Sequence, residues 1–376
     1  MSESVYLEGQ ELILDGTKVA WHTDRVAKWE NGERFAPVTV DIALTRACNY
    51  GCHFCYAMLQ ENDKKIINQR VINEFLDDAA EIGVRGISLV GDGESSISPV
   101  FLETIKRGSE NGISMACASN GLTITKARAE EILPHLTYLR INFSAGEPKR
   151  YAEIMGAKEA WFDRVCRNIE DMMEIKRKHN LDVTIGMQMV VMPEYKDQIV
   201  PLAKLGSELK PDYLVLKHCS DDEEGSLGVQ YDKYEELYEK FRTAETFSTD
   251  EYKVVVKWSK IEANGERSYQ RCYGAPFLIQ ISGTGLLAPC SMMFNEGYKK
   301  FHLGNICETR FKDLVFSDEY WEVMNHLASP NFNAQVSCPS LCLQHKFNEA
   351  LDNHVKGITD INLTKGSSKP MHINFV

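Results

Sequence analysis

Three cysteines near the start of the chain form the residue group with the clearest chemical meaning. Cys48, Cys52 and Cys55 follow the spacing C-x3-C-x2-C, directly after a segment typical of a β-strand. Three thiolates on one short loop can bind three irons of a 4Fe–4S cube, and the fourth iron then stays open to the amine and carboxylate of a chelating ligand. The alternative is a structural zinc site that recruits His53, because such sites close with four ligands. The spacing favours the iron–sulfur cluster.

A second group of cysteines lies in the last third of the chain. Four of them, Cys272, Cys290, Cys338 and Cys342, form one C-x17-C pair and one C-x3-C pair. Four thiolates from separate strands and loops can bind one complete auxiliary 4Fe–4S cluster. The same residue types also allow a zinc site with four cysteine ligands, and the iron content distinguishes the two. Cys307, between the pairs, is interpreted as a spare cysteine, with a role as a ligand as the alternative.

Alternating strand-like and helix-like segments follow the first cysteine group. The apolar pattern predicts strands at 38–44, 86–90, 113–118, 138–143, 183–191 and 213–216. It predicts helices at 68–82, 100–111, 125–133, 160–179 and 196–209. Six strand–helix units imply an α/β fold with a parallel sheet and helices outside it. They are too few for an eight-stranded barrel, so we expect a partial, TIM-like (βα)6 barrel whose carboxyl strand ends carry the chemistry.

The same pattern divides the chain into four parts. Residues 1–37 are a polar N-terminal extension, and residues 38–217 form the partial barrel. Residues 218–271 form a bridging segment, in which the acidic run Asp221–Glu224 is interpreted as a solvated loop rather than a metal site. Residues 272–376 are expected to form a small α+β iron–sulfur domain, with a β-hairpin at 277–290 and a C-terminal tail.

The first cysteine loop, with Phe54 before its third cysteine, resembles the signature of the radical S-adenosylmethionine (SAM) superfamily. The resemblance covers residues 38–217. It implies that SAM binds the open iron through its methionyl group, and that one electron from the reduced cluster cleaves the sulfonium. The 5′-deoxyadenosyl radical then abstracts a hydrogen atom from the substrate. A flavodoxin or ferredoxin as electron donor is implied by the family alone.

Further motifs resemble the SAM-binding positions of this family. Gly91-Asp92-Gly93-Glu94 resembles its GGE motif, with Asp92 in place of the first glycine. Gly93 would let the backbone approach SAM closely, and Glu94 would accept hydrogen bonds from the SAM ammonium group. Turn formation and strand-end capping are the alternative roles of such residues. Ser119 and Asn120, at the end of the third predicted strand, resemble the TNG motif of the family. The resemblance also implies that Asn142, Ser144 and Gln188, on the fourth and fifth predicted strands, lie near the ribose or methionyl group of SAM.

The second cysteine group resembles the SPASM/twitch extension of radical SAM enzymes. A full SPASM domain usually carries seven cysteines and two clusters, whereas residues 272–342 contain five cysteines. The resemblance therefore implies the shorter, twitch-like form with one auxiliary 4Fe–4S cluster. Within it, Gly304-Asn305 would form the turn before a helix.

Three residues after the sixth predicted strand are candidates for chemistry on the substrate. Cys219 carries a thiol, which can donate a hydrogen atom to a carbon radical in an epimerisation. Lys217 or His218 can instead act as the base in a dehydrogenation, with the auxiliary cluster as electron acceptor. The alternative is that Cys219 is a small buried apolar residue and His218 a structural donor. Cys117 and Cys166 are interpreted as structural.

Composition disfavours several classes of protein. The formal net charge of −12 disfavours general nucleic-acid binding, which needs a basic footprint, although it does not exclude one local basic groove. No apolar run reaches the roughly 18–20 residues of a membrane span. The first residues lack the pattern of a secretory signal, so we expect a cytoplasmic protein.

These observations together predict an enzyme that dehydrogenates or epimerises a small molecule, such as a sugar, an aminocyclitol or a nucleotide-linked sugar. A single auxiliary cluster favours this, and the 47 residues before Cys48 leave little room for a separate leader-peptide-binding domain. The alternative is a maturase that modifies a peptide or protein by epimerisation, thioether formation or side-chain oxidation. The open three-cysteine site disfavours a non-catalytic iron–sulfur sensor.

Overall fold

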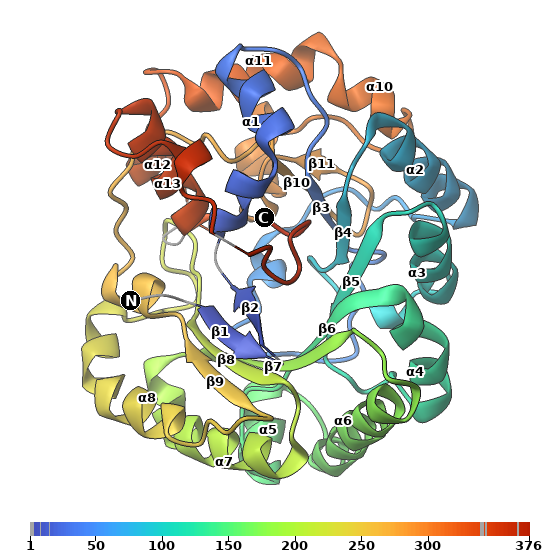
Figure 1. The fold of residues 1–376 in the computed structure, drawn as a ribbon, viewed down its shortest axis with the longest axis vertical. Helices are drawn as coiled ribbons and strands as arrows, with labels where there is room; N and C mark the ends of the chain where they lie inside the picture. Colours follow the sequence, from blue (N-terminus) through green and yellow to red (C-terminus); the bar gives the residue numbers. More distant parts are fainter. Residues whose placement is uncertain (1–3, 8, 15, 339–341, 343, 367) are drawn as a thin grey trace.

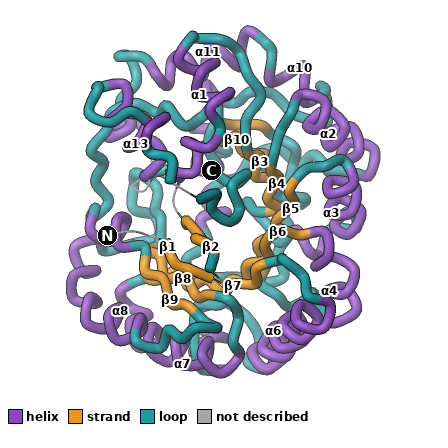
Figure 2. The backbone as a smooth tube through the Cα atoms, in the orientation of Figure 1, coloured by secondary structure: helices purple, strands orange, loops and turns teal. Residues whose placement is uncertain are grey.

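A curved parallel sheet with helices on its outer face is the central feature of the molecule (Figures 1 and 2). The computed structural model describes residues 4–7, 9–14, 16–338, 342, 344–366 and 368–376. In this part of the chain the sheet has nine strands, in the order β11-β10-β3-β4-β5-β6-β7-β8-β9. The central strands are β3 (Thr39–Ile42), β4 (Gly86–Leu89), β5 (Ser114–Ser119), β6 (Leu136–Asn142), β7 (Thr184–Val191) and β8 (Tyr213–His218).

All neighbouring pairs from β3 to β8 are parallel, so the order of these strands in space is their order in the chain. This confirms the predicted α/β fold with six strand–helix units. The two outer strands, β11 and β9, are not paired with each other over the described residues, so the sheet is an open arc rather than a closed barrel. Because parallel strands place their carboxyl ends at one edge, the loops of that edge can share one site.

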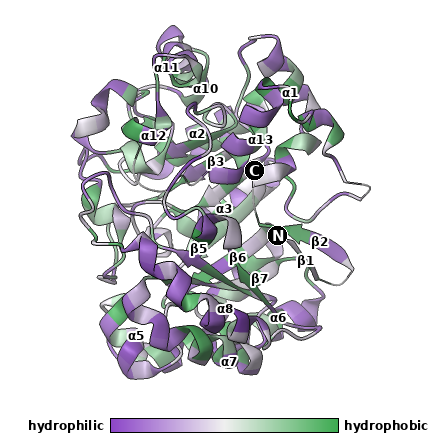
Figure 3. Cartoon of the chain, turned by 90° about the vertical axis from the view of Figure 1, so that its left-hand side faces the viewer, coloured by the Kyte–Doolittle hydropathy of each residue, from purple (hydrophilic) through white to green (hydrophobic). Residues whose placement is uncertain are grey.

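Amphipathic helices cover the outer face of the arc. They are α2 (Gln69–Ile82), α3 (Phe101–Glu110), α4 (Lys126–Ile132), α5 (Pro148–Met155), α6 (Ala160–His179), α7 (Ile199–Leu209) and α8 (Tyr238–Glu245). Hydrophilic and hydrophobic residues occur together on α5, α7 and α8 (Figure 3), as expected for helices with one buried face. The sequence pattern does not predict α5, because its eight residues are too few for a clear periodicity. No described helix is long and apolar enough to cross a membrane.

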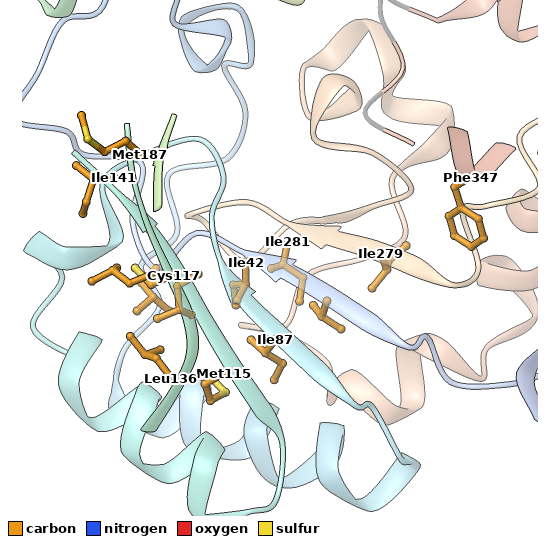
Figure 4. Close-up of a cluster of buried hydrophobic side chains, with 14 of the residues drawn as sticks. Ile42, Ile87, Met115, Cys117, Leu136, Ile141, Met187, Ile279, Ile281 and Phe347 are labelled. Carbon is orange, nitrogen blue, oxygen red and sulfur yellow. The ribbon is translucent and has the colours of Figure 1, made fainter. Parts of the chain in front are cut away.

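Apolar side chains fill the space between the sheet and these helices. Ile42, Ile87 and Ile281 lie on three neighbouring strands and are almost completely buried (Figure 4). Cys117 on β5 is also fully buried in this core. Cys166 on α6 is partly buried against the same cluster of side chains. Each buried aliphatic side chain contributes roughly 1.5–3 kcal/mol, so this layer holds the strands that carry the site.

Both ends of the chain cover the amino ends of the strands, opposite the cysteine loop. The N-terminal elements are β1 (Ser4–Leu7), β2 (Gln10–Ile13) and α1 (Thr23–Glu30). The antiparallel β1–β2 hairpin packs its Leu7 and Leu12 side chains on Tyr213 at the start of β8. At the start of β3, Thr39 Oγ1 donates a hydrogen bond to Asn374 O at 2.7 Å. The predicted N-terminal extension is therefore a folded part of the barrel base.

The C-terminal half of the chain contributes strands to both ends of the sheet. β9 (Lys253–Val256) pairs parallel with β8, and β10 (Leu278–Ile281) pairs parallel with β3. β11 (Leu287–Ala288) returns antiparallel to β10, so this hairpin extends the barrel sheet instead of starting a separate one. The domain boundaries at 217 and 272 stay predictions. The helices of this half are α9 (Trp258–Glu262), α10 (Phe311–Val315), α11 (Asp318–Ala328), α12 (Ala334–Ser337) and α13 (His345–Val355).

The acidic run after β8 differs from the sequence-based expectation at its first residue. Asp221 is buried, and its carboxylate accepts hydrogen bonds from the backbone N–H groups of Leu227 at 2.8 Å and Val229 at 3.1 Å. The prediction of a wholly solvated loop is wrong for this residue, because the loop folds back over its carboxylate. Asp221 therefore stabilises the loop from inside.

Candidate active site

The first cysteine loop leaves the carboxyl end of β3 and rests on the end of α5. The backbone N–H of Gly51 donates to Gly156 O at 3.2 Å, and that of His53 donates to Ile154 O at 3.1 Å. The hydroxyl groups of Tyr50 and Tyr151 are 2.9 Å apart. A helix that the sequence pattern does not predict thus fixes the conformation of the loop.

The three thiols of this loop lie near one another in an environment that disfavours bare thiolates. Burial raises the pKa of Cys48 and of Cys52, and each of these two thiolates would be destabilised further by Cys55 and Glu94. A set of thiolates here requires a bound cation, which a 4Fe–4S cluster supplies. Three cysteine ligands on one loop fit a 4Fe–4S cluster that keeps one iron open.

Two glycines from other loops hold the backbone that enters the cysteine loop. A Cβ atom on Gly93 would lie 2.0 Å from Thr45 O, and a Cβ atom on Gly283 would lie 2.2 Å from Thr45 C. Only glycine fits at such distances from a backbone. Gly93, predicted as a SAM-binding residue, therefore packs against the start of the cysteine loop.

Asp92, which stands where the family motif has glycine, joins three loops. Its carboxylate accepts a hydrogen bond from the Gly283 N–H at 2.8 Å and forms an ion pair with Arg46 Nε at 3.2 Å. Burial raises the pKa of Asp92, while Gly283 and Arg46 act in the opposite direction. The departure from the motif thus ties the β10–β11 hairpin to the cysteine loop through a side chain.

Glu94 links the loop after β4 to the end of β5 through hydrogen bonds. Its side chain is buried, and its two carboxylate oxygens accept hydrogen bonds from Ser96 N–H at 3.1 Å, Ser119 Oγ at 2.9 Å and Asn120 N–H at 2.7 Å. Asn120 also donates from Nδ2 to Asn49 Oδ1 at 2.7 Å, inside the cysteine loop. The predicted SAM-binding residues Glu94, Ser119 and Asn120 therefore form one hydrogen-bonded group next to the cysteines.

A cavity of about 450 Å³ lies within the arc, at the level of these loops. At its upper part Gln188 Nε2 donates to Asn142 Oδ1 at 2.8 Å. Ser144 differs from these two residues, because it is fully buried and its hydroxyl accepts from the Val190 N–H at 3.3 Å. Of the predicted site residues, the cavity lining includes Phe54, Cys55, Asp92, Asn142, Gln188, Lys217, His218 and Cys219, and it does not include Gly93, Glu94, Ser119, Asn120 or Ser144.

The candidates for substrate chemistry lie at the carboxyl end of β8. The strand continues through His218, so Lys217 and His218 are strand residues rather than loop residues. The Cys219 thiol is 3.8 Å from Phe54 O, and burial raises its pKa to about 12. Burial and the neighbouring Arg140 lower the pKa of Lys217 to about 7, and burial lowers that of His218 to about 3. Near neutral pH the thiol therefore keeps its hydrogen, and the imidazole is neutral.

The second cysteine group forms a cluster of thiols beside the hairpin. Burial raises the pKa of Cys272, Cys290 and Cys338, and each of these thiols is influenced electrostatically by Cys342. The three residues between Cys338 and Cys342 lie outside the described residues. Such a group of buried thiols again requires bound cations to become thiolates, which fits an iron–sulfur cluster.

Cys307 lies elsewhere. Its Sγ is 3.8 Å from Ile66 O and 3.7 Å from Thr284 O, and its pKa responds to Lys65 and Asp63 rather than to another cysteine. Cys307 is therefore not among the cysteines that influence one another electrostatically, namely Cys272, Cys290, Cys338 and Cys342.

Asn348 is a neighbour of these cysteines that the sequence pattern does not indicate. It is completely buried on α13, and its Nδ2 lies 3.7 Å from Cys272 Sγ and 3.6 Å from Cys342 Sγ. Its Oδ1 accepts a hydrogen bond from the Gly274 N–H at 2.8 Å, which orients the amide. An asparagine 76 residues away from Cys272 has no local signal, so only the fold reveals this contact.

The fold and the three-cysteine loop together define a domain built to bind an iron–sulfur cluster at the carboxyl edge of a partial barrel. Residues 42–205 match the model of the radical SAM superfamily, so this part of the chain is a radical SAM domain. Domains of this family use SAM and a 4Fe–4S cluster. The matched residues agree with the extent of the resemblance at 38–217.

Known proteins support the same class. A probable GTP 3′,8-cyclase from Thermococcus kodakarensis is 26% identical over 181 residues, which cover 47% of this chain and 58% of that protein. The sporulation killing factor maturation protein SkfB from Bacillus subtilis is 24% identical over 168 residues, 44% of this chain and 39% of that protein. The chain thus spans about half the length of the curated relatives it matches. The crystal structure of Streptococcus suis SuiB bound to S-adenosylmethionine has a TM-score of 0.63 and 18% identity, covering 94% of this chain and 81% of that one, which shows a shared fold.

Proposed function

We propose that the chain is a radical SAM enzyme that cleaves SAM reductively and abstracts a hydrogen atom from a small molecule, which it dehydrogenates or epimerises. Cys48, Cys52 and Cys55 would hold the SAM-binding cluster. When bound, the cluster and SAM supply one electron and a 5′-deoxyadenosyl radical. Asn142 and Gln188 line the cavity where the ribose or methionyl group would contact the barrel, and Glu94 would accept a hydrogen bond from the ammonium group.

The observation that carries the proposal is the position of Cys219. Cys219 is one of the residues that line the cavity, and its Sγ is 3.8 Å from Phe54 O in the cysteine loop, which supports a role beside the proposed SAM site. Because its pKa is raised to about 12, the thiol holds a hydrogen atom at neutral pH. Transfer of this hydrogen atom to the opposite face of a carbon radical would break the S–H bond and invert the carbon centre, as an epimerisation needs. The thiyl radical left on Cys219 would become a thiol again by taking one electron from the proposed auxiliary cluster and one proton from solvent.

A dehydrogenation would use a base instead of a hydrogen donor. Lys217 fits this role better than His218, because a base with a pKa near the working pH balances proton affinity and protonation state. The pKa of Lys217 is lowered to about 7, whereas that of His218 is lowered to about 3. The electron released in this reaction would pass to an auxiliary cluster held by Cys272, Cys290, Cys338 and Cys342. A flavodoxin or ferredoxin is the proposed donor for the first cluster.

Modification of a peptide is the second candidate function. It is favoured by the shared fold with SuiB, which is also known in a structure bound to the precursor peptide SuiA, and by the partial similarity to the maturation protein SkfB. Tight binding of a short peptide encoded beside this protein would support it. The volume of the cavity, about 450 Å³, and the charged residues in its lining favour a small molecule.

Iron content and SAM cleavage test the proposal first. The protein is reconstituted anaerobically, and iron and 5′-deoxyadenosine are measured for the wild type and for a Cys48/Cys52/Cys55→Ala variant. Two cubane clusters predict about eight irons per chain, falling to about four in the variant, with 5′-deoxyadenosine formed by the wild type alone. About four irons falling to none would remove the auxiliary cluster and with it the dehydrogenation route. Absence of SAM cleavage by a fully loaded protein would refute the enzymatic proposal.

A further inference from the structure

Two side chains of opposite charge, Asp41 on β3 and Arg140 on β6, line the cavity on the amino side of the Asn142–Gln188 pair. These two residues are called the deep pair. Arg140 precedes Asn142 by two residues on the same strand, so both side chains share one face of the sheet and Arg140 is nearer the amino end. The register from β3 to β6 sets Asp41 in line with Tyr138, which precedes Arg140 by two residues. The deep pair therefore lies below the level proposed for SAM, away from the cysteine loop.

A buried amide orients the carboxyl group of Asp41. Gln280, opposite Asp41 in the pairing of β10 with β3, donates from Nε2 to Asp41 Oδ2 at 3.2 Å. Gln280 is itself buried, and its Oε1 accepts a hydrogen bond from the Ser291 N–H, which fixes the direction of the amide. Within the described residues Asp41 accepts no other hydrogen bond, so its Oδ1 keeps its acceptor capacity.

The guanidinium group of Arg140 has unused donors. In the part of the chain that the structure describes it makes no hydrogen bond or ion pair, and its buried Nε has no partner. Its Cζ lies 5.9 Å from the centre of the Tyr138 ring, whose hydroxyl is 3.0 Å from Ser88 Oγ. Because buried polar atoms are almost always hydrogen-bonded, donors left open beside a cavity point to a ligand with acceptor oxygens.

The two charges of the deep pair influence each other without direct contact. Burial raises the pKa of Asp41 to about 7, and the charge of Arg140 acts in the opposite direction. They nevertheless form no ion pair among the described residues, so their nitrogen and oxygen atoms are more than 4.0 Å apart. On the strands between them, Ser88 pairs with Asp41 and Ala118 pairs with Arg140, and these small side chains leave room. The arrangement fits a ligand that bridges the two groups.

We infer that the deep pair binds neighbouring hydroxyl groups of a neutral polyol ring in the substrate, which donate to Asp41 and accept from Arg140. The inference rests on the proposed function and names the groups that the same cavity recognises. A hydroxyl group both donates and accepts, so a pair of hydroxyls can satisfy a carboxylate and a guanidinium group together. Because the two charges cancel, an anion would be repelled by Asp41 and a cation by Arg140, and either would leave a buried charge without its counterpart.

Lys217 belongs to a different level of the cavity. The pairing of β7 with β8 sets Val190, two residues beyond Gln188, opposite Lys217. Lys217 and the following Cys219 therefore lie on the carboxyl side of Gln188, where the chemistry is proposed. A ring held by the deep pair would extend from the depth of the cavity toward these residues, so recognition and reaction would use opposite ends of the substrate.

Binding of neutral polyols to the reconstituted, SAM-loaded protein tests this inference. myo-Inositol, D-glucose and D-galactose are titrated calorimetrically into the wild type, Asp41→Asn and Arg140→Gln, with inorganic phosphate and glycine as anionic and zwitterionic probes. We expect at least one polyol to bind the wild type and to bind each variant about ten- to a hundred-fold more weakly. Asp163→Asn and Arg164→Gln, on the exposed side of α6, are the matched controls and should bind like the wild type. Asp41→Asn keeps the size of the side chain and provides the test if Arg140→Gln does not fold.

The possible outcomes separate this inference from the proposed function. Unchanged polyol affinity in the folded variants would overturn it, as would phosphate or glycine binding that is tighter than polyol binding and depends on the same side chains. A loss of SAM affinity as large as the loss of polyol affinity would also overturn it, because the deep pair would then act through the SAM site. Absence of polyol binding by a wild-type protein that carries its clusters and cleaves SAM would refute the inference alone. A fully loaded protein that binds a polyol through the deep pair without cleaving SAM would instead refute the proposed function and leave the polyol site in place.

Discussion

Replacing Glu94 by glutamine should destabilise the protein, although the side chain keeps its size. The carboxylate is 4% exposed and accepts hydrogen bonds from Ser96, Ser119 and Asn120. A glutamine amide has one acceptor oxygen, so its NH₂ group must face at least one of these donors. An unsatisfied buried N–H costs about 1–3 kcal/mol, and the remaining bonds lose their charge assistance. We expect the free energy of unfolding to fall by about 2–4 kcal/mol.

The same substitution tests the role of Glu94 toward SAM. Urea unfolding of the cluster-free protein measures the structural effect, and SAM titration of the reconstituted protein measures the binding effect. If Glu94 also accepts a hydrogen bond from the SAM ammonium group, SAM affinity should fall about ten-fold or more. Glu103→Gln, on the exposed surface of α3, is the matched control and should change stability by less than about 0.5 kcal/mol. Equal stability of Glu94→Gln and the wild type would refute the reasoning from the hydrogen bonds.

Three further substitutions test separate parts of the structure. Asn348→Leu removes the N–H groups near the second cysteine group. It should lower the midpoint potential of an auxiliary cluster by on the order of 50 mV, measured in an EPR-monitored redox titration. An unchanged potential would contradict the proposed contact between Asn348 and the cluster ligands. Asp78→Asn removes the buried partner of Arg310, an ion pair that joins α2 to the start of α10. The free energy of unfolding, measured with urea, should fall by about 2 kcal/mol, and equal stability of the variant and the wild type would refute this expectation. His22 has a pKa lowered by burial from 6.5 to about 4, so between these values the unfolded chain binds a proton that the folded chain does not. Stability should fall as the pH falls through this window, by up to about 1.4 kcal/mol per pH unit, and His22→Gln should flatten that slope.

The strands and helices of the barrel could be predicted from local patterns in the sequence. The helix at 68–82 is an example, because Asn68 caps it and Gly83 ends it in the left-handed conformation. The hairpin near 277–290 could also be predicted from the sequence. Its pairing with β3 could not, because β10 pairs with a strand more than 200 residues earlier in the chain. Short elements such as α5 and the β1–β2 hairpin carry too few residues for a periodic signal.

What the sequence determined by itself is the chemistry that depends on neighbouring residues in the chain. Three cysteines within one loop stay close in any fold, so Cys48, Cys52 and Cys55 could be interpreted as cluster ligands and the radical SAM class could be predicted from them. Tertiary structure alone decided which distant residues surround that loop. Gly283 packs against Thr45 because β10 pairs with β3. Arg140 lowers the pKa of Lys217 because β6 and β8 both contribute residues to one cavity. Such contacts arise from packing between strands far apart in the chain, and no local pattern encodes them.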